Sequence, residues 1–283
     1  MNSPVIVFDT SALSKLIKGG FRLQPYLSAL TCGFDVWLTA MSVDELIATP
    51  VPETRETLIA GLQCLLASGR CVWPPHEVLT LLCTKHADDP SGFDWRKVDI
   101  RAVRYERAIV DREFTDDLCD TQLLEQRSVE KQYMDFWLDL RSRLQPLLGS
   151  EREGRPRSYG QAAEIARTGK VLIGLAKPLY ERGSKIGINH DDVKAFLDAC
   201  PPFRAVCYGL VGSWFDVSVA SQVFKKLAGR NDQMMAAYLP YCSRFATDDA
   251  KQGKRLREIA FEAQLNCDVL SYKQFLESFD VVV

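Results

Sequence analysis

Five carboxylates of this 283-residue chain are spaced so that a parallel sheet would bring them together. They are Asp9, Glu45, Asp232, Asp248 and Asp249. We expect Asp9 and the Asp248–Asp249 pair to end two buried strands, and the other two acids to begin helices beside the same edge. Carboxylates crowded in a poorly hydrated cleft repel one another strongly unless a cation lies among them. Since these are hard oxygen ligands with no His or Cys nearby, the set favours Mg²⁺ or Mn²⁺ over zinc.

Divalent ions of this kind bind phosphates, activate water and stabilise the charge that builds on a phosphodiester under attack. A metal site formed by these acids would therefore suit chemistry on phosphodiesters, with either Asp248 or Asp249 as the acid after the fourth strand. Each acid also has a plainer structural explanation, because carboxylates commonly cap helices and interact with the helix dipole. It is the pattern as a set that indicates a site.

Apolar runs and helical periodicity predict the elements that must position these acids. Strands are expected at residues 4–9, 35–39, 70–73, 244–247 and 268–270. The first helix is expected to begin near Ala12. Further helices are expected at residues 44–47, 53–67, 76–84, 205–227, 231–239, 250–263 and 273–279. Either Thr10 or Ser11 could cap the first helix. Such alternation at both ends of the chain is typical of one α/β domain with a central parallel sheet.

The middle of the chain has helical periodicity, few strand signals and two segments of opposite charge. Residues 88–140 hold eight Lys/Arg against fourteen Asp/Glu, and residues 141–187 hold ten against four. The net charges of −6 and +6 would let these segments pair with each other or bind a regulatory protein. We therefore divide the chain into a first part of the α/β domain at 1–87, a helical insertion or subdomain at 88–204 and a second part at 205–283.

Composition places the chain among ordinary globular proteins and excludes several function classes. An apolar share of 47%, a charged share of 25% and a net charge of −2 argue against disorder, a rod or a generally basic nucleic-acid binder. The nine scattered cysteines include no Cys-x-x-Cys pair, which indicates reduced thiols in a cytoplasmic protein. We expect no signal peptide and no membrane-spanning helix. No phosphate-binding glycine motif occurs, which argues against a nucleoside triphosphatase or a dinucleotide-dependent oxidoreductase.

Four short motifs occur in the order in which they occur in PIN domains. The segment 5–13 resembles the opening motif, a strand followed by Asp-x-Ser-x-Leu. The segment 41–47 is similar to the second motif, in which an acid follows the second strand. The segment 231–237 resembles the third, an Asp followed by small residues on a helix. The segment 244–249 resembles the fourth, a strand that ends in Thr and then an acid.

The resemblance covers residues 4–85 and 215–279 and leaves the middle of the chain unmatched. It implies a three-layer α/β/α domain with Mg²⁺- or Mn²⁺-dependent nuclease activity, most often on RNA. By motif position, it implies metal-site acids at Asp9, Glu45 and Asp232, a fourth acid at Asp249 or else Asp248, and supporting polar groups at Ser11 and Thr247. The reaction that the resemblance implies is in-line hydrolysis, with Asp9, Asp232 and Asp249 holding one or two metal ions. Glu45 would position the attacking water or complete the second metal site.

A nucleic-acid substrate also needs positive charge near the acids. Lys251, Lys254 and Arg255 follow the fourth strand and are the expected contacts, with a simple solvated helix face as the alternative. The expected partner is RNA, with DNA left open by the sequence. A homo-oligomer is left open as well.

Three other functions remain alternatives at this stage. One is a structure-specific DNA nuclease, and another is a catalytically inactive scaffold of the same fold that binds nucleic acid or protein. The third is a phosphatase with Asp9 as its nucleophile. Ser11 counts against the phosphatase, because that chemistry needs a second Asp at position 11.

Overall fold

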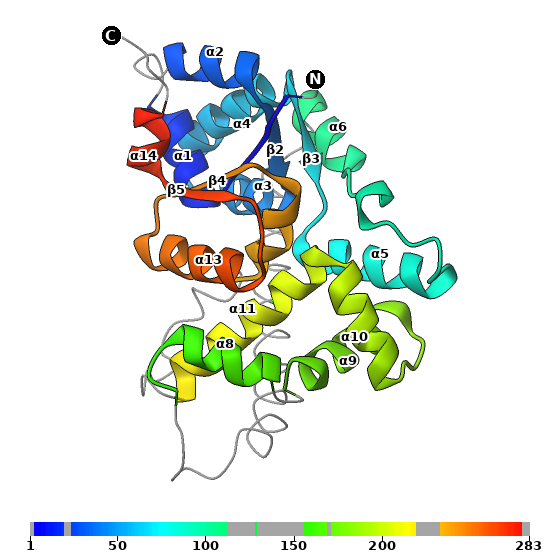
Figure 1. Cartoon of the computed structure of the whole chain (residues 1–283). Helices are drawn as coiled ribbons and strands as arrows, with labels where there is room; N and C mark the ends of the chain where they lie inside the picture. The colour runs from blue at the N-terminus through cyan, green and yellow to red at the C-terminus, as the bar shows by residue number, and fades with distance from the viewer. Residues whose placement is uncertain are drawn as a thin grey trace.

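The computed structural model describes residues 3–19, 24–112, 156–168, 171–218 and 233–278, together with Ser128. Within them, five parallel strands form one sheet in the order β3-β2-β1-β4-β5 (Figure 1). The strands are β1 (Val5–Phe8), β2 (Asp35–Thr39), β3 (Gly69–Val72), β4 (Arg244–Thr247) and β5 (Asp268–Ser271). Every predicted strand agrees with these bounds to within one residue at each end. The all-parallel sheet confirms the predicted α/β class.

The central strand β1 is apolar on both faces, as a parallel strand covered by helices on each side must be. Ile6 and Phe8 are buried in the core on one face of the sheet, and Val7 is buried in the core on the other. β1 pairs in parallel with β2 on one side and with β4 on the other. The residue that follows β1 therefore lies near the middle of the carboxyl edge of the sheet.

Helices cover both faces of the sheet and complete the expected three-layer arrangement (Figure 1). One layer contains α1 (Thr10–Lys18), α2 (Gln24–Gly33), α3 (Ala40–Ile47), α4 (Pro52–Leu66) and α14 (Tyr272–Glu277). The other contains α5 (Pro75–Asp88), α11 (Pro201–Ser218), the 3₁₀ helix η4 (Met235–Tyr241) and α13 (Ala250–Glu262). The two buried cores lie on opposite faces of the sheet.

The described part of the 88–204 segment is largely helical, as expected. It contains η2 (Trp95–Lys97), α6 (Val103–Asp111), α8 (Tyr159–Thr168), α9 (Val171–Ser184) and α10 (His190–Ala199). The Ala102 amide donates to the Cys71 carbonyl oxygen at 2.8 Å, so the start of α6 is fastened to the edge strand β3. Helices α8, α9 and α10 pack beside α11 and α5 and share one buried core with them.

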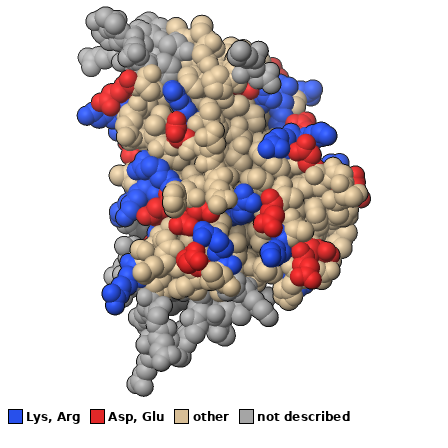
Figure 2. Space-filling view, viewed as in Figure 1, with Lys and Arg blue, Asp and Glu red and all other residues tan. Residues whose placement is uncertain are grey.

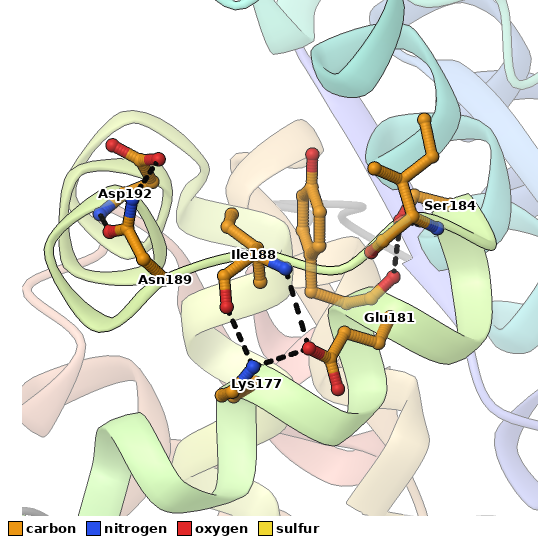
Figure 3. Close-up of polar contacts among 8 residues, drawn as sticks. Lys177, Glu181, Ser184, Ile188, Asn189 and Asp192 are labelled. Atoms are coloured by element: carbon orange, nitrogen blue, oxygen red, sulfur yellow. Dashed lines mark hydrogen bonds and ion pairs between the residues drawn. The ribbon is translucent and has the colours of Figure 1, made fainter.

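Polar contacts close the turn between α9 and α10 (Figure 3). The Lys177 ammonium group lies against the Glu181 carboxylate and donates to the Ile188 carbonyl oxygen at 2.7 Å. The Ile188 amide donates to the same Glu181 carboxylate at 3.3 Å. Asn189 then caps α10 by accepting a hydrogen bond from the Asp192 amide at 2.9 Å. The network links the end of α9 to the start of α10 and gives these polar groups a structural role.

His86 lies inside the core that α5 shares with α9 and α10. Its imidazole Nδ1 is 2.8 Å from the Tyr180 hydroxyl, and its ring contacts Phe93 and Phe196 with centroid separations of 5.2 and 4.5 Å. His86 is only 7% exposed, and burial lowers the pKa of its imidazole below the usual value. This histidine is therefore a core residue, and the folded protein holds it neutral at a pH where the unfolded chain protonates it.

Acidification below about pH 6.5 is expected to destabilise the protein through His86. Because the folded-state pKa of this histidine is depressed, the unfolded state binds more protons as the pH falls, and its stabilising contribution is present only above that range. The test compares urea-unfolding free energies at about pH 7.5 and about pH 5.5. His86→Gln should reduce the pH dependence of the unfolding free energy. A smaller dependence should remain because burial also lowers the pKa of His76. An unchanged slope in the variant would contradict the assignment.

Two helix boundaries differ from the prediction near the expected acids. Helix α1 is capped by Asp9, and not by Thr10 or Ser11, because the Asp9 carboxylate accepts the Ala12 amide. The helix thus begins at Thr10. Glu45 was expected to begin a helix, but α3 begins five residues earlier at Ala40, so Glu45 lies in its second turn. Both differences arise because the short strands turn directly into helices with no intervening loop.

Other differences concern segments with weak sequence signals. The helix expected at 231–239 is, in its described part, mainly the 3₁₀ helix η4, which contains Pro240. Proline lacks the amide donor that an α-helix needs, and 3₁₀ turns are the usual outcome in short segments. Helix α11 starts at Pro201, four residues before its predicted start. Helix α2 was not predicted at all, because Pro25 and the mixed pattern around it gave no clear helical period.

The described residues include most of the cysteines and several apolar helices of the chain. Eight of the nine cysteines are described, and all eight are free thiols. Five of these eight are buried, as expected for most of the cysteines. In the part of the chain that the structure describes, no helix combines the length and the apolarity needed to span a bilayer.

Candidate functional site

The carboxyl edge of the sheet carries a row of polar residues at one level. The registers pair Thr39 with Val72 and Thr247 with Ser271. Continuing the pairing of β1 with its two neighbours puts Asp9 level with Thr39 on one side and Thr247 on the other. Neighbouring strands lie about 4.8 Å apart, so Asp9 has a hydroxyl-bearing residue within reach on each side.

Asp9 is a buried carboxylate with hydrogen bonds to both oxygens. Its exposed fraction is 6%. Oδ1 accepts the Ala12 amide at 2.8 Å, and Oδ2 accepts the Ser11 and Thr247 hydroxyls at 2.8 and 2.7 Å. Burial raises the pKa of Asp9, these hydrogen bonds lower it, and the nearby charge of Asp249 raises it further, with a net increase. The side chain is thus held in one orientation and would gain from a cation that relieves its burial and repulsion.

Asp249 is connected to Asp9 through the hydroxyl of Thr247. The Asp249 amide donates to the Thr247 hydroxyl oxygen at 3.0 Å, and this hydroxyl lies 2.7 Å from the Asp9 carboxylate. Asp249 also caps α13, because its Oδ1 accepts the amides of Lys251 and Gln252 at 2.7 and 2.9 Å. Oδ1 therefore orients the side chain, and Oδ2 accepts no hydrogen bond from the part of the chain that the structure describes.

Asp248 has a different environment from its neighbour Asp249. Its carboxylate pairs with the Lys15 ammonium group at 2.5 Å, and its amide donates to the Ser11 hydroxyl oxygen at 3.1 Å. An ammonium partner neutralises much of the charge that a metal ion would otherwise use. Of the two acids left open by the sequence, Asp249 has the better position for the fourth site acid.

Glu45 lies beside the residue that follows Asp9. The Thr10 hydroxyl hydrogen-bonds to the Glu45 carboxylate and lies 3.2 Å from the Ser42 hydroxyl. The Thr39 hydroxyl contacts Ser42 at 2.9 Å, so these hydroxyls connect the ends of β1 and β2. Glu45 is exposed, unlike Asp9. Thr10, Ser42 and Lys15 were not expected at the site, although Thr10 directly follows the first predicted strand and Ser42 lies three residues after the second.

Asp232, the remaining expected acid, lies outside the described residues. Over the described ranges, no three His, Cys, Asp or Glu side chains gather closely enough to hold a metal ion. The donor types that are present, carboxylate and hydroxyl oxygens, fit Mg²⁺ or Mn²⁺ and do not fit a soft metal. The metal set that the sequence predicts therefore depends on Asp232 joining Asp9 and Asp249.

The three basic residues expected to contact nucleic acid have different surroundings on α13. Figure 2 shows Lys and Arg side chains gathered over this helix, with acidic side chains among them. Lys251 is exposed, and the Lys254 side chain is 77% exposed. Arg255 is 13% exposed, is paired with Asp216 and Glu258, and lies over the Tyr159 ring. Lys251 and Lys254 are exposed enough to meet phosphates, although Lys254 lies 3.9 Å from the Glu258 carboxylate, whereas the largely buried Arg255 charge is paired with both Asp216 and Glu258.

Comparisons of this chain with protein-family models, with curated proteins and with solved structures return no match.

Thr247→Val is expected to raise the pKa of the Asp9 carboxyl further, because the variant removes a hydrogen bond that lowers it. Thr247 is 1% exposed, so no water replaces the lost donor without rearrangement. Thr247→Ser keeps the hydroxyl and should leave that pKa close to its parent value. A carboxyl-detected NMR titration of all three proteins measures the effect. Equal Asp9 pKa values in the Val and Ser variants would show that the hydroxyl does not govern this carboxylate.

Proposed function

We propose that this protein is a metal-dependent nuclease of the PIN-like type, and specifically an endoribonuclease. The observation that supports the proposal best is the pair of hydroxyl links at the carboxyl edge of the sheet. Thr247 lies between Asp9 and Asp249, and Thr10 connects the chain at Asp9 to Glu45. The strand order and the order of the four acidic motifs are consistent with that type.

Mg²⁺ or Mn²⁺ is the cofactor that the oxygen donors suit, and Asp9, Asp249 and Asp232 would hold it. When bound, such an ion supplies charge neutralisation and Lewis acidity toward a phosphodiester. Asp9 contributes a carboxylate fixed before substrate arrives, because Ala12, Ser11 and Thr247 all hydrogen-bond to it. Little of its side-chain freedom is left to be lost on binding.

The remaining groups of the site would act on substrate and water. Glu45 is exposed beside Thr10, where its carboxylate can orient a water molecule for in-line attack and accept its proton. Lys251 and Lys254 provide positive charge at the start of α13 for the phosphates of the strand. Lys15 balances Asp248, so that acid does not add to the repulsion of an incoming phosphate.

A phosphatase fits the site less well. Such an enzyme with an aspartate nucleophile needs a second acid at the position of Ser11 to protonate the leaving group. The Ser11 hydroxyl instead donates to Asp9 and accepts the Asp248 amide. These bonds give Ser11 a structural role.

A catalytically inactive binding scaffold of the same fold is the second candidate. The observation that favours it is that the described residues alone do not form a three-ligand metal group. Its partner would be a nucleic acid or a protein.

The deciding experiment incubates the purified full-length chain with single-stranded RNA and, side by side, with flap DNA. Each substrate is tested with Mg²⁺, with Mn²⁺ and with a chelator. An endoribonuclease is expected to cut the RNA within the strand in a chelator-sensitive way, and preferential cutting of the flap would assign a DNA nuclease. Absence of cutting, together with no heat on Mn²⁺ titration and an unchanged Tm in Mn²⁺, would overturn the nuclease proposal in favour of the scaffold.

A further inference from the structure

Arg104 on α6 is held against two aromatic rings. Its guanidinium carbon lies 5.0 Å from the centre of the Trp73 ring and 5.3 Å from that of Tyr105. The guanidinium also hydrogen-bonds to the Tyr105 side chain. The two rings meet edge to face at 6.3 Å, so they form a corner that fixes the guanidinium. Arg104 is nevertheless exposed to solvent.

This aromatic corner is anchored to the main fold at several points. The Trp73 amide donates to the Ile100 carbonyl oxygen at 2.9 Å, and the Tyr238 hydroxyl donates to the Trp73 carbonyl oxygen at 2.6 Å. The Tyr105 hydroxyl donates to Asp44 at 3.0 Å, and Asp44 precedes Glu45 on α3. A guanidinium fixed on such a support is preorganised, so it loses little freedom when a ligand binds.

The corner lies on the same edge of the sheet as the candidate site. Trp73 directly follows Val72, which is level with Thr39 at the carboxyl end of the neighbouring strand. Asp9 is one strand further on, so the end of β3 is two strands, or about 10 Å, from Asp9. A nucleic-acid strand that reached Asp9 along this edge would pass Arg104.

The charges around Arg104 leave it and one neighbour available. The Arg101 guanidinium donates to both carboxylate oxygens of buried Glu106, so its charge is already paired. Arg107 lies one turn after Arg104, is exposed and has no ion pair within the described ranges. The next acid on that side of the helix is Asp111. Figure 2 shows basic side chains over α6 with acidic side chains among them.

We infer that Arg104, supported by Trp73, stacks against an unpaired base of a single-stranded nucleic acid bound across the carboxyl edge. Arg107 then contacts a phosphate of the same strand. A planar guanidinium stacks on bases and carries charge at once, whereas a duplex hides its base faces. The inference rests on the proposed function and narrows its substrate to single strands.

The chain contains a matched control for this arrangement. Arg96 also lies over a tryptophan, with its guanidinium carbon 4.9 Å from the Trp95 ring. Trp95 packs on Tyr241, which lies just before the start of β4 and contacts Trp37. This second stack therefore lies on the face of the sheet that α5 and α11 cover, level with the middle of β2 and not with its carboxyl end, where Asp9 lies. Arg96→Ala therefore removes an equivalent arginine–tryptophan stack from a part of the molecule that the proposed nucleic-acid strand does not cross.

The test measures binding of a fluorescent oligouridylate by anisotropy, with Asp9→Asn in every protein so that the probe stays intact. Adding Arg104→Ala or Arg104→Lys is expected to raise Kd about tenfold, because neither side chain offers a planar face. Adding Arg96→Ala should leave Kd unchanged. With a probe of abasic residues, the Arg104 variants should bind nearly as well as the parent. Arg107→Ala should lower the slope of log Kd against log salt by about one.

Several results would overturn the inference. If Arg104→Lys keeps the parent Kd, or if the abasic probe is equally sensitive to Arg104→Ala, Arg104 acts only as a charge. If Arg96→Ala weakens binding as much as Arg104→Ala, the effect is not local to this edge. Failure here is separable from failure of the proposed function. A chain that cuts RNA with KM unaltered by Arg104→Lys refutes only the stacking role, whereas a chain that neither binds nor cuts any probe refutes both.

Discussion

Asp9→Asn is expected to lower the rate of RNA cleavage by at least about a thousandfold while the protein stays folded. Asparagine keeps the size of the side chain, and its carbonyl oxygen can still accept the Ala12 amide that Asp9 accepts at 2.8 Å. It removes the negative charge, and its NH₂ group faces the Thr247 hydroxyl, which must then turn to accept. The carboxylate that the cation needs is lost, whereas the helix cap remains.

The measurement is a single-turnover rate in Mn²⁺, with Tm recorded for each protein. Asp268→Asn is the matched control, because Asp268 is an exposed acid at the amino end of β5 and should leave the rate unchanged. Asp249→Asn should resemble Asp9→Asn, and Asp248→Asn should have the smaller effect, because Lys15 already neutralises Asp248. A folded Asp9→Asn protein that cuts RNA at the parent rate would show that catalysis does not depend on this edge of the sheet.

Gly69→Ala is expected to destabilise the fold by about 3 kcal/mol. Gly69 begins β3 opposite Val36 of β2. A Cβ at this position would lie 2.1 Å from the Val36 carbonyl oxygen and 3.1 Å from that of Leu65. Both obstacles are backbone atoms, so no rotamer change relieves the clash and the two strands must separate locally. Chemical denaturation measures the loss, and Tm should fall by several degrees.

Gly33→Ala provides the control for the same chemical change. Gly33 ends α2, and a Cβ there would have no atom within 4 Å. Its effect on the unfolding free energy should therefore stay within about 0.5 kcal/mol. Equal stabilities of the Gly69 and Gly33 variants would mean that β3 is not packed against β2 as closely as the structure has it.

The positions of the strands could be predicted from the sequence because their signals are local. Val5–Phe8 is a run of apolar, mostly β-branched residues, and such a run is buried wherever the chain places it. The same reasoning put Asp9 and Asp249 just after strands, and parallel strands of one sheet end at one edge. The fold class and the neighbourhood of these acids follow from that. Helix α2 was missed because its ten residues have no comparable period.

Pairing of charges could not be predicted, because the partners are far apart along the chain. Lys15 and Asp248 meet across the α1–β4 junction, and Arg255 meets Asp216 from a different helix. These contacts decide that Asp248 is neutralised and that Arg255 is not a free cation. Arg104 is a similar case, since only the packing of α6 against the end of β3 brings it over Trp73.

The sequence by itself therefore determined which residues form the sheet and which acids follow its strands, since burial and periodicity act over a few neighbouring residues. Only the tertiary structure decided that Asp248 has an ammonium partner, which hydroxyls orient Asp9 and which arginine lies over Trp73. The physical reason is that a charge is neutralised, or a hydroxyl shared, by whatever group lies within a few ångströms. Those neighbours are set by the packing of distant segments.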